Sequence, residues 1–309
     1  MENKLHVTAS PHIHSGRSTR KVMLDVIISL LPATIAGAVI FGARALFVVV
    51  VCIGVSVLAE FAFNAITKRE QSVSDLSAIV TGLILALNLP ANAPLWQVGV
   101  GAVFAIIVVK CLFGGIGKNV VNPAATARVF MLVAFSALTK PAFPQGADAV
   151  SGATPLAQLA EDTTPELMDL FLGNIGGCIG ETCTLALLIG GLYLLIKKVI
   201  TWHIPVAFIG TAFLFTLAVE GGNIETSLAW ILSGGLFLGA IFMATDYVTS
   251  PATPFGRVVF GVGAGLITVL IRFWGVYPEG VSFAILIMNI LNPFIDSLTA
   301  RKLFGGRKR

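Results

Sequence analysis

Long apolar runs dominate the chain and are separated by short polar stretches. Ten such runs occur, near residues 22–41, 45–66, 76–90, 96–113, 119–138, 174–196, 203–219, 226–244, 257–274 and 281–297. A helix needs about 20 apolar residues to cross the hydrocarbon core of a bilayer. Because lipid cannot hydrogen-bond the backbone, each run is expected to be a helix that pairs its own N–H and C=O groups. The pattern therefore predicts an all-α, polytopic membrane protein with about ten transmembrane helices.

Two of the ten runs contain residues that interrupt a helix. The third run ends in Asn88-Leu89-Pro90, and the fifth opens with Asn119 and with Asn122-Pro123. Proline cannot donate to the helical ladder, and an amide side chain in a membrane is costly unless it is paired. We therefore expect the third and fifth spans to be broken or re-entrant.

Composition excludes several other classes of protein. Hydrophobic residues make up 56% of the chain, charged residues only 12%, and the mean hydropathy is +0.91. A disordered chain, a disulfide-stapled secreted domain and a nucleic-acid-binding protein each need a different composition. Membrane lipid is therefore an expected partner, and nucleic acid is not.

The Lys and Arg residues orient the predicted helices, because cytoplasmic loops of membrane proteins are enriched in them. Only Arg44 and Lys140 fall outside if the amino terminus is cytoplasmic, and Lys110, Arg128 and Arg272 lie within spans. The rest fall on the cytoplasmic side: Lys4, Arg17, Arg20, Lys21, Lys68, Arg69, Lys118, Lys197, Lys198, Arg257, Arg301, Lys302, Arg307, Lys308 and Arg309. The distribution predicts that both termini are cytoplasmic and that the one long loop, which is acidic, is extracytoplasmic.

This topology divides the chain into five parts and suggests a repeat. The parts are a cytoplasmic segment (1–21), a first five-helix half (22–138), the outer loop (139–173), a second five-helix half (174–297) and a basic cytoplasmic tail (298–309). Lys110 matches Arg272, and Asn122-Pro123 matches Asn292-Pro293, at an offset of about 160 to 170 residues. Halves of five helices would run in opposite directions, as in inverted repeats. The alternative is that Gly, Pro and Asn recur by chance in apolar sequence.

The outer loop contains the segment Asp148-Ala149-Val150-Ser151-Gly152-Ala153-Thr154-Pro155. Taken locally, Thr154 is a helix N-cap and Pro155 the first helical residue. A cap does not explain the preceding Asp-x-x-Ser-Gly-Ala, whose small residues leave Thr154 open to a large reactant. The segment is therefore a candidate for chemical modification.

The pattern Asp-x-x-Ser-Gly-Ala-Thr resembles the sequence at which a flavin transferase joins FMN to threonine through a phosphoester bond. With ten spans and this motif after the fifth helix, the chain is similar to the family formed by the D subunit of Rnf complexes and the B subunit of the sodium-pumping NADH:quinone reductase. Its short polar amino-terminal segment is more similar to the Rnf branch. The resemblance implies covalent FMN on Thr154, with Asp148, Ser151, Gly152 and Ala153 as the attachment motif. A helix amino terminus would stabilise the phosphodiester charge.

The resemblance also implies a function. The chain would be a subunit, not catalytic alone, of an ion-translocating ferredoxin:NAD oxidoreductase in the bacterial cytoplasmic membrane. It would relay electrons beside subunits that hold iron-sulfur clusters, a further flavin and the NAD site, and this electron flow would be coupled to Na⁺ or H⁺ transport. The alternatives are the B subunit of the sodium-pumping reductase, and a flavin-free secondary transporter or channel, for which broken spans are equally typical.

A second candidate site lies at Asn119 and Asn122. In the sodium-pumping reductase's B subunit, two asparagines with this spacing hold a noncovalent riboflavin, and the resemblance implies the same role here. Amide groups suit an isoalloxazine edge, which has both donors and acceptors. The structural alternative is that Asn119 caps the fifth helix and that Asn122 hydrogen-bonds to a neighbouring helix.

Other polar residues are weaker candidates. Glu60, Glu181 and Asp25 lie in or at the ends of spans, where ionisable groups are candidates for an ion path. Arg128 lies deeper, where it would face the flavin or pair with Glu60. The four cysteines lack the spacing of metal ligands and are expected to be small apolar fillers, so no metal site is predicted.

Overall fold

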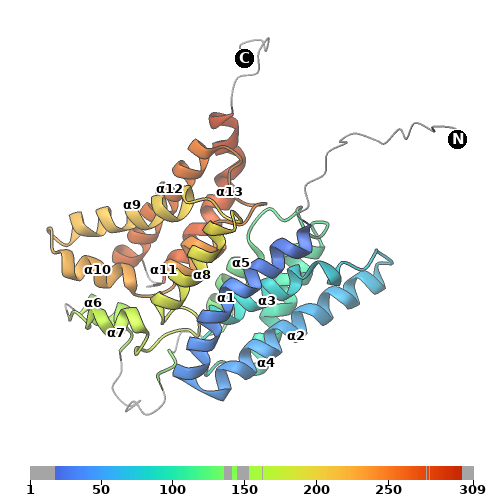
Figure 1. The fold of residues 1–309 in the computed structure, drawn as a ribbon, viewed down its shortest axis with the longest axis horizontal. Helices are drawn as coiled ribbons and strands as arrows, with labels where there is room; N and C mark the ends of the chain where they lie inside the picture. The colour runs from blue at the N-terminus through green and yellow to red at the C-terminus, as the bar shows by residue number, and fades with distance from the viewer. Residues whose placement is uncertain are drawn as a thin grey trace, which may run out of the picture.

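The computed structural model describes residues 18–135, 141–144, 153–161, 163–275, 277 and 279–300. These residues form helices, turns and one isolated β-bridge between Ala142 and Gly177, and no strand (Figure 1). The predicted all-α membrane fold is thereby confirmed. The two ends of the chain, 1–17 and 301–309, lie outside the described residues.

The helices follow the predicted apolar runs. They are α1 Thr19–Phe41, α2 Ala43–Ile66, α3 Ser77–Leu87, α4 Leu95–Val103, α5 Pro123–Ala134, α6 Pro155–Ala160, α7 Leu167–Leu172, α8 Thr184–Ile196, α9 His203–Val219, α10 Ile224–Leu232, α11 Leu236–Leu238, α12 Pro254–Trp274 and α13 Val281–Thr299. Two of them continue as π-helices, α4 into η2 (Phe104–Cys111) and α11 into η4 (Gly239–Met243), and a 3-10 turn, η1 (Val73–Asp75), precedes α3. Each of the ten predicted spans therefore contains helix.

The described helices cross the bilayer in three different ways. Helices α1, α2, α12 and α13 are each long and apolar enough to span it alone. Helices α10 and α11 with η4 are long and apolar enough only together, and they are bent by 64° at their break, as in a broken span or a re-entrant loop. The remaining apolar helices are shorter, among them α3 and α5 with 11 and 12 residues. The third and fifth spans, which were predicted to be broken or re-entrant, each contain one short helix, and the break in the eighth was not predicted.

The break in the eighth span occurs at Ser233-Gly234-Gly235. Gly234 has a φ of +67°, which L side chains rarely adopt, and a Cβ there would lie 2.9 Å from Leu156 Cδ1 of α6. Only glycine fits such a conformation in such a close approach. The chain therefore turns sharply where the apolar pattern predicted a continuous helix.

The bundle has two opposite faces, which differ in the helix ends and loops that lie there. We call the side at which α1 begins and α2, α8 and α13 end the basic face, and the opposite side, with α6, α7 and 141–144, the loop face (Figure 1). On the basic face Arg69 Nη1 donates to Cys111 O at 3.1 Å, and on the loop face Asn92 Nδ2 donates to Pro141 O at 3.2 Å. Thr154 and the pair Asn119 and Asn122 therefore belong to opposite faces.

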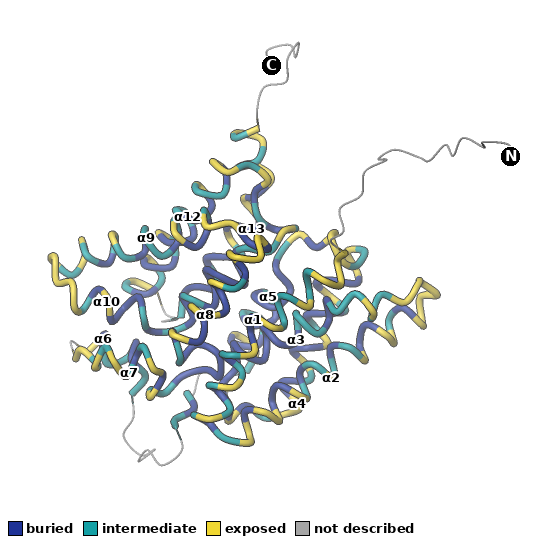
Figure 2. Tube along the Cα trace, viewed as in Figure 1, coloured by how far each residue is buried: buried dark blue, intermediate teal, exposed yellow. Residues whose placement is uncertain are grey.

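Apolar side chains on the outer sides of the helices are exposed in the isolated chain. Figure 2 shows this exposure along the outer surfaces of α1, α2 and α9, which include Val39, Leu58 and Leu214. In a bilayer these side chains would contact lipid, because lipid is the only apolar medium outside the bundle.

Small residues let several helices approach closely. A Cβ on Gly190 of α8 would overlap the backbone oxygen of Ser29 of α1, and one on Gly265 of α12 would lie 2.8 Å from Phe208 O of α9. Without a hydrophobic force between helices in lipid, such close packing provides much of the attraction.

We expect Gly190→Ala to destabilise the protein by about 1–3 kcal/mol, because the added methyl group overpacks the α1–α8 contact. Gly210→Ala is the matched control, since a Cβ on Gly210 of α9 meets nothing within 4 Å. Thermal unfolding in detergent would measure both. Equal melting temperatures for the two variants would contradict the close α1–α8 contact.

Candidate functional site

A cavity of about 420 Å³ opens on the basic face between α1, α3, α8 and the segment that precedes α5. Its walls are mostly apolar and include Val22, Val26, Val80, Ile84 and Phe242. Ligand pockets have volumes of about 300–1,000 Å³ and combine apolar walls with a few placed polar groups. The cavity therefore has the size and lining of a small-molecule site.

The polar groups of the cavity include both predicted asparagines. Asn119, Asn122, Asp246 and Lys110 all line it. Asn119 Nδ2 donates to Val121 O at 3.1 Å and to Asp246 Oδ2 at 3.4 Å. Burial raises the pKa of the Asp246 carboxyl above its ordinary value, although hydrogen bonds from Val248, Thr249 and Asn119 act in the opposite direction. The two asparagines that the sequence predicted as a pair therefore line the same cavity.

Asn122 is engaged within the protein itself. Its Oδ1 accepts the backbone N–H groups of Ala124 and Ala125 at 3.0 and 3.1 Å, and its Nδ2 donates to Met243 O at 3.0 Å. The Asn122 backbone N–H donates to Asn289 Oδ1 at 3.0 Å. Asn122 is therefore the cap of α5 and also its bond to the second half of the chain. The structural alternative was right that Asn122 bonds to a neighbouring element. It was wrong that Asn119 is the cap, because Pro123 takes the first helical position and puts Asn122 just before it.

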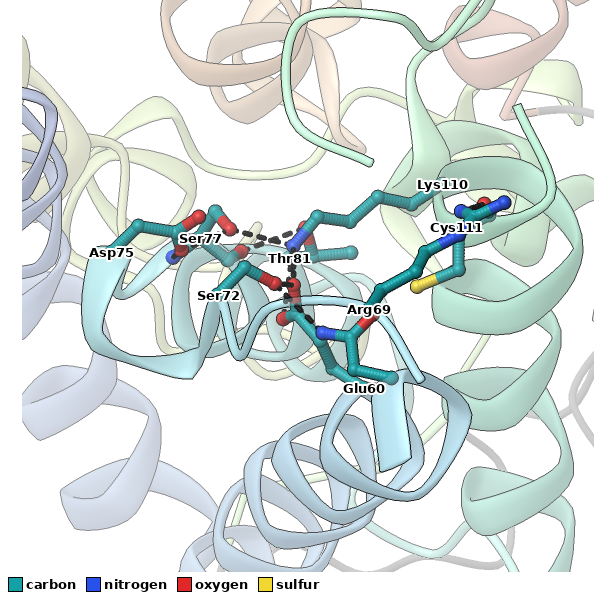
Figure 3. A network of polar contacts seen from close by, with 9 residues as sticks. Glu60, Arg69, Ser72, Asp75, Ser77, Thr81, Lys110 and Cys111 are labelled. Atoms are coloured by element: carbon teal, nitrogen blue, oxygen red, sulfur yellow. Dashed lines mark hydrogen bonds and ion pairs between the residues drawn. The ribbon is translucent and has the colours of Figure 1, made fainter. Parts of the chain in front are cut away.

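Lys110, which lines the cavity, belongs to a buried ion pair (Figure 3). Lys110 Nζ lies 3.0 Å from both carboxylate oxygens of Glu60 and 2.6 Å from Ser77 Oγ. Ser72 Oγ donates to Glu60 Oε1 at 2.6 Å and accepts from Asn64 Nδ2 at 3.0 Å. The side chains of Lys110 and Glu60 are only 3% and 1% exposed. The suggested pairing of Arg128 with Glu60 was therefore wrong.

Arg128 instead belongs to a second buried cluster near the loop face. Its Nη2 lies 2.7 Å from Glu279 Oε2 and 3.5 Å from Cys178 Sγ. Glu181 Oε1 accepts the Cys178 N–H at 2.8 Å. Cys178, Glu181 and Glu279 offer ligand atoms within 4.8 Å of one another, but the Arg128 cation already occupies this cluster. Cys178 is thus in contact with charged groups and is not a simple apolar filler.

On the loop face Thr154 is the N-cap of α6. Its Oγ1 accepts the Ala157 N–H at 3.2 Å, and Pro155 is the first helical residue, as the sequence predicted. Leu156 and Leu159 of α6 pack with Leu170 of α7 and Trp230 of α10. Thr154 is partly buried at the start of this packed helix. The motif residues Asp148, Ser151 and Gly152 lie outside the described residues, whereas Ala153 accepts from Gln158 Nε2 at 3.1 Å.

Arg272 lies close to the same region. It donates to Trp230 O and, at 2.9 Å, to Ser233 O, the carbonyls that precede the break in the eighth span. A Cβ on Gly234 would lie 3.1 Å from Arg272 Nη2. Arg272 therefore fixes a broken helix near the loop face, as Lys110 fixes the start of α3 at the basic face. Such an arrangement would follow from an inverted repeat, which stays a prediction.

Comparison with known proteins places the chain in a family. Residues 6–305 match the model of the NQR2, RnfD, RnfE family. The chain belongs to this family. The resemblance noted in the sequence is thereby confirmed.

Named relatives cover nearly the whole chain. It is 45% identical to the D subunit of the Na⁺-translocating ferredoxin:NAD⁺ oxidoreductase complex of Acetobacterium woodii, over 99% of this chain and 97% of the relative. It is 39% identical to the D subunit of the proton-translocating ferredoxin:NAD⁺ oxidoreductase complex of Clostridium ljungdahlii, over 99% and 98%. It is 38% identical to the D subunit of the ion-translocating oxidoreductase complex of Stutzerimonas stutzeri, over 94% of each.

Sequence reasoning missed three residues of the site in this family member: Lys110 as a wall of the cavity, Asp246 as the partner of Asn119, and Asn289 as the acceptor for Asn122. A polar side chain inside an apolar run signals that it has an internal partner. That signal was present for Lys110 and Asn289, but it does not say which partner each residue has.

We expect Asn122→Ala to destabilise the protein by about 1–3 kcal/mol, because it removes the cap of α5 and leaves Met243 O without its donor. Asn223→Ala is the matched control, since Asn223 caps α10 in the same way but at an exposed site. Thermal unfolding in detergent distinguishes them. If Asn122→Ala lowered the melting temperature no more than Asn223→Ala, the bond of Asn122 to the second half of the chain would not contribute to stability.

Proposed function

We propose that the chain is the membrane subunit of an Rnf-type ion-translocating oxidoreductase complex and carries FMN covalently on Thr154. The observation that carries this proposal is the Asp148 to Thr154 motif in a chain 45% identical to the D subunit of a ferredoxin:NAD⁺ oxidoreductase complex. The chain is not catalytic alone. Its partners are the iron-sulfur, flavin and NAD-binding subunits of the complex, and a flavin transferase attaches the FMN.

The proposal also assigns a topology. The protein is a multi-pass protein of the bacterial cytoplasmic membrane, with the basic face and both termini in the cytoplasm and Thr154 outside. The distribution of Lys and Arg supports this orientation. The relatives from Acetobacterium woodii and Clostridium ljungdahlii are named for Na⁺ and for protons. Transport of one of these ions is coupled to electron flow through the complex.

The geometry at Thr154 is compatible with an attached flavin. The Thr154 hydroxyl oxygen is at a surface that α7 and α10 support from beneath, through Leu156 and Leu159. Packing of α6 holds the backbone of residues 155–160 in place, so the attached group would have a defined origin. Thr154 Oγ1 needs no buried partner other than the Ala157 N–H, and a phosphoester oxygen can still accept that bond.

The cavity on the basic face fits a noncovalent riboflavin. Its volume of about 420 Å³ and apolar walls suit an aromatic ring system, and Asn119 and Lys110 are among its polar lining residues. Asn119 is the better ligand of the two asparagines, because Asn122 Oδ1 is filled by two backbone N–H groups. Asn122 instead shapes the cavity by capping α5.

A flavin at each face would give the chain a relay function. The flavins supply the redox chemistry, whereas the protein fixes their positions and the polarity around them. Asn119, Asn122 and Lys110 do this at the basic face, and the packed helix α6 does it at the loop face. The helices between the two sites are held by the buried pair Lys110–Glu60 and by the pair of buried Arg128 with half-buried Glu279.

Thr154→Ala is expected to abolish the ultraviolet fluorescence of the denatured gel band near 32 kDa, because the attachment oxygen is lost. Thr163→Ala, a change of the same kind in the same loop, should keep it. Mass spectrometry of the peptide from Asp148 to Leu159 should find an added FMN less one water in the wild-type protein. An unmodified wild-type peptide from a host with the flavin transferase would refute the proposal.

We expect Asn119→Ala to weaken riboflavin binding by about 3- to 10-fold, the effect of one lost hydrogen bond of about 1 kcal/mol. The binding is measured as flavin released on denaturing the Thr154→Ala protein, which has no covalent FMN. Asn92→Ala, at the loop face, is the control and should keep the wild-type flavin content. Equal flavin content in the Asn119 and Asn92 variants would show that Asn119 does not bind the riboflavin.

A further inference from the structure

Lys110 lines the basic-face cavity and is also paired with a buried carboxylate. Its side chain lines the basic-face cavity, and its ammonium group is bound to Glu60 and Ser77. It extends from the π-helix η2, and π-helices occur frequently at functional sites. A cation thus stands between a carboxylate and the space that the proposed function assigns to riboflavin.

The hydrogen bonds around Lys110 have a fixed direction (Figure 3). Asp75 Oδ1 accepts both the backbone N–H of Ser77, at 2.7 Å, and the Ser77 hydroxyl. Because the Ser77 hydroxyl donates to Asp75, its oxygen accepts from Lys110 at 2.6 Å. One ammonium group is therefore held by Glu60 directly and by Asp75 through Ser77.

Stability alone does not account for this pair. Two buried charges lose their hydration, and an apolar pair of similar volume is often as stable or more stable. Lys and Glu within transmembrane segments are rare and usually serve a function. Here the Lys110 cation lies at the wall of an apolar cavity, and the Glu60 carboxylate offsets part of its charge.

We propose that Lys110 is a positioning residue that sets the reduction potential of the flavin in the basic-face cavity, and that Glu60 moderates its effect. This inference rests on the proposed riboflavin site. A reduced isoalloxazine carries more negative charge than the oxidised one, so a nearby cation favours the reduced form. Because the walls are apolar, the field of the ammonium group is weakly screened inside the cavity. Glu60 offsets part of that field.

The test uses the purified full-length Thr154→Ala protein, so that the noncovalent flavin is observed alone. Glu60→Gln keeps the shape of the side chain and one acceptor oxygen, but it removes the charge and the second oxygen that accepts from Lys110. Lys110 then keeps the indirect contact to Asp75 through Ser77. We expect the ratio of affinities for reduced over oxidised riboflavin to rise about tenfold, a potential about 30 mV higher for a two-electron couple. Spectroelectrochemical titration of the bound riboflavin measures the potential.

Two further variants separate the role of Lys110 from a general effect of charge. Adding Lys110→Met to Glu60→Gln removes the cation without leaving a buried carboxylate, and it should reverse the shift. Arg69→Met removes a cation that donates to Cys111 O and does not line the cavity, and it should leave the potential unchanged.

The outcomes distinguish the two proposals. Riboflavin that is still bound and has the same potential with Glu60→Gln as with Glu60 intact would overturn the role of Lys110. The riboflavin site itself would then remain. No releasable flavin from the Thr154→Ala protein would overturn the site and, with it, the role of Lys110. A fall in potential of about the same size in Arg69→Met would show that charge outside the cavity wall, and not Lys110 in particular, sets the potential.

Discussion

The structure depends on one constraint of the bilayer: every backbone group that a broken helix leaves free must find a partner inside the protein. Helix α3 ends at Leu87, and the Leu87 and Leu89 carbonyls accept the N–H groups of Gly180 and Ile179 at 2.8 and 3.0 Å. Asn122 satisfies the first N–H groups of α5, and Arg272 satisfies the carbonyls before α11. The breaks at α3 and α5 are thus tied to the second half of the chain, whereas Arg272 closes its break within that half.

The buried cations need counterions or dipoles, because a charge inside the bundle has lost its hydration. Lys110 is paired with Glu60 and Arg128 with Glu279, whereas Arg272 donates to the Trp230 and Ser233 carbonyls. Arg272 therefore satisfies backbone groups at a helix break. Lys110 instead donates to Ser77 at the start of α3 and lines the cavity, so its ion pair links a short helix to the candidate site.

The local sequence pattern predicted most of the helices but few of the side-chain pairs between them. The ten apolar runs, the cap at Thr154 and the interruptions at Pro90 and Pro123 are properties of neighbouring residues, so the sequence indicates them directly. The break at Gly234 is different, because it depends on Arg272, 39 residues from Ser233. The partner of Arg128 is 151 residues away, and from the sequence Glu60 was equally plausible. Such choices depend on how the helices rotate against one another, which apolar periodicity in a membrane does not determine.

The two candidate sites differ in how strongly they enclose a ligand, and this difference explains why only one would need a covalent bond. The basic-face cavity lies among several helices, so burial of apolar surface can retain an aromatic ligand there without a bond. Thr154 is instead partly exposed at the start of a six-residue helix that packs against α7 and α10. A surface of this kind buries too little of a ligand to hold it for long. A tether keeps the group in place while leaving it accessible, and access is what a carrier must offer to a partner protein.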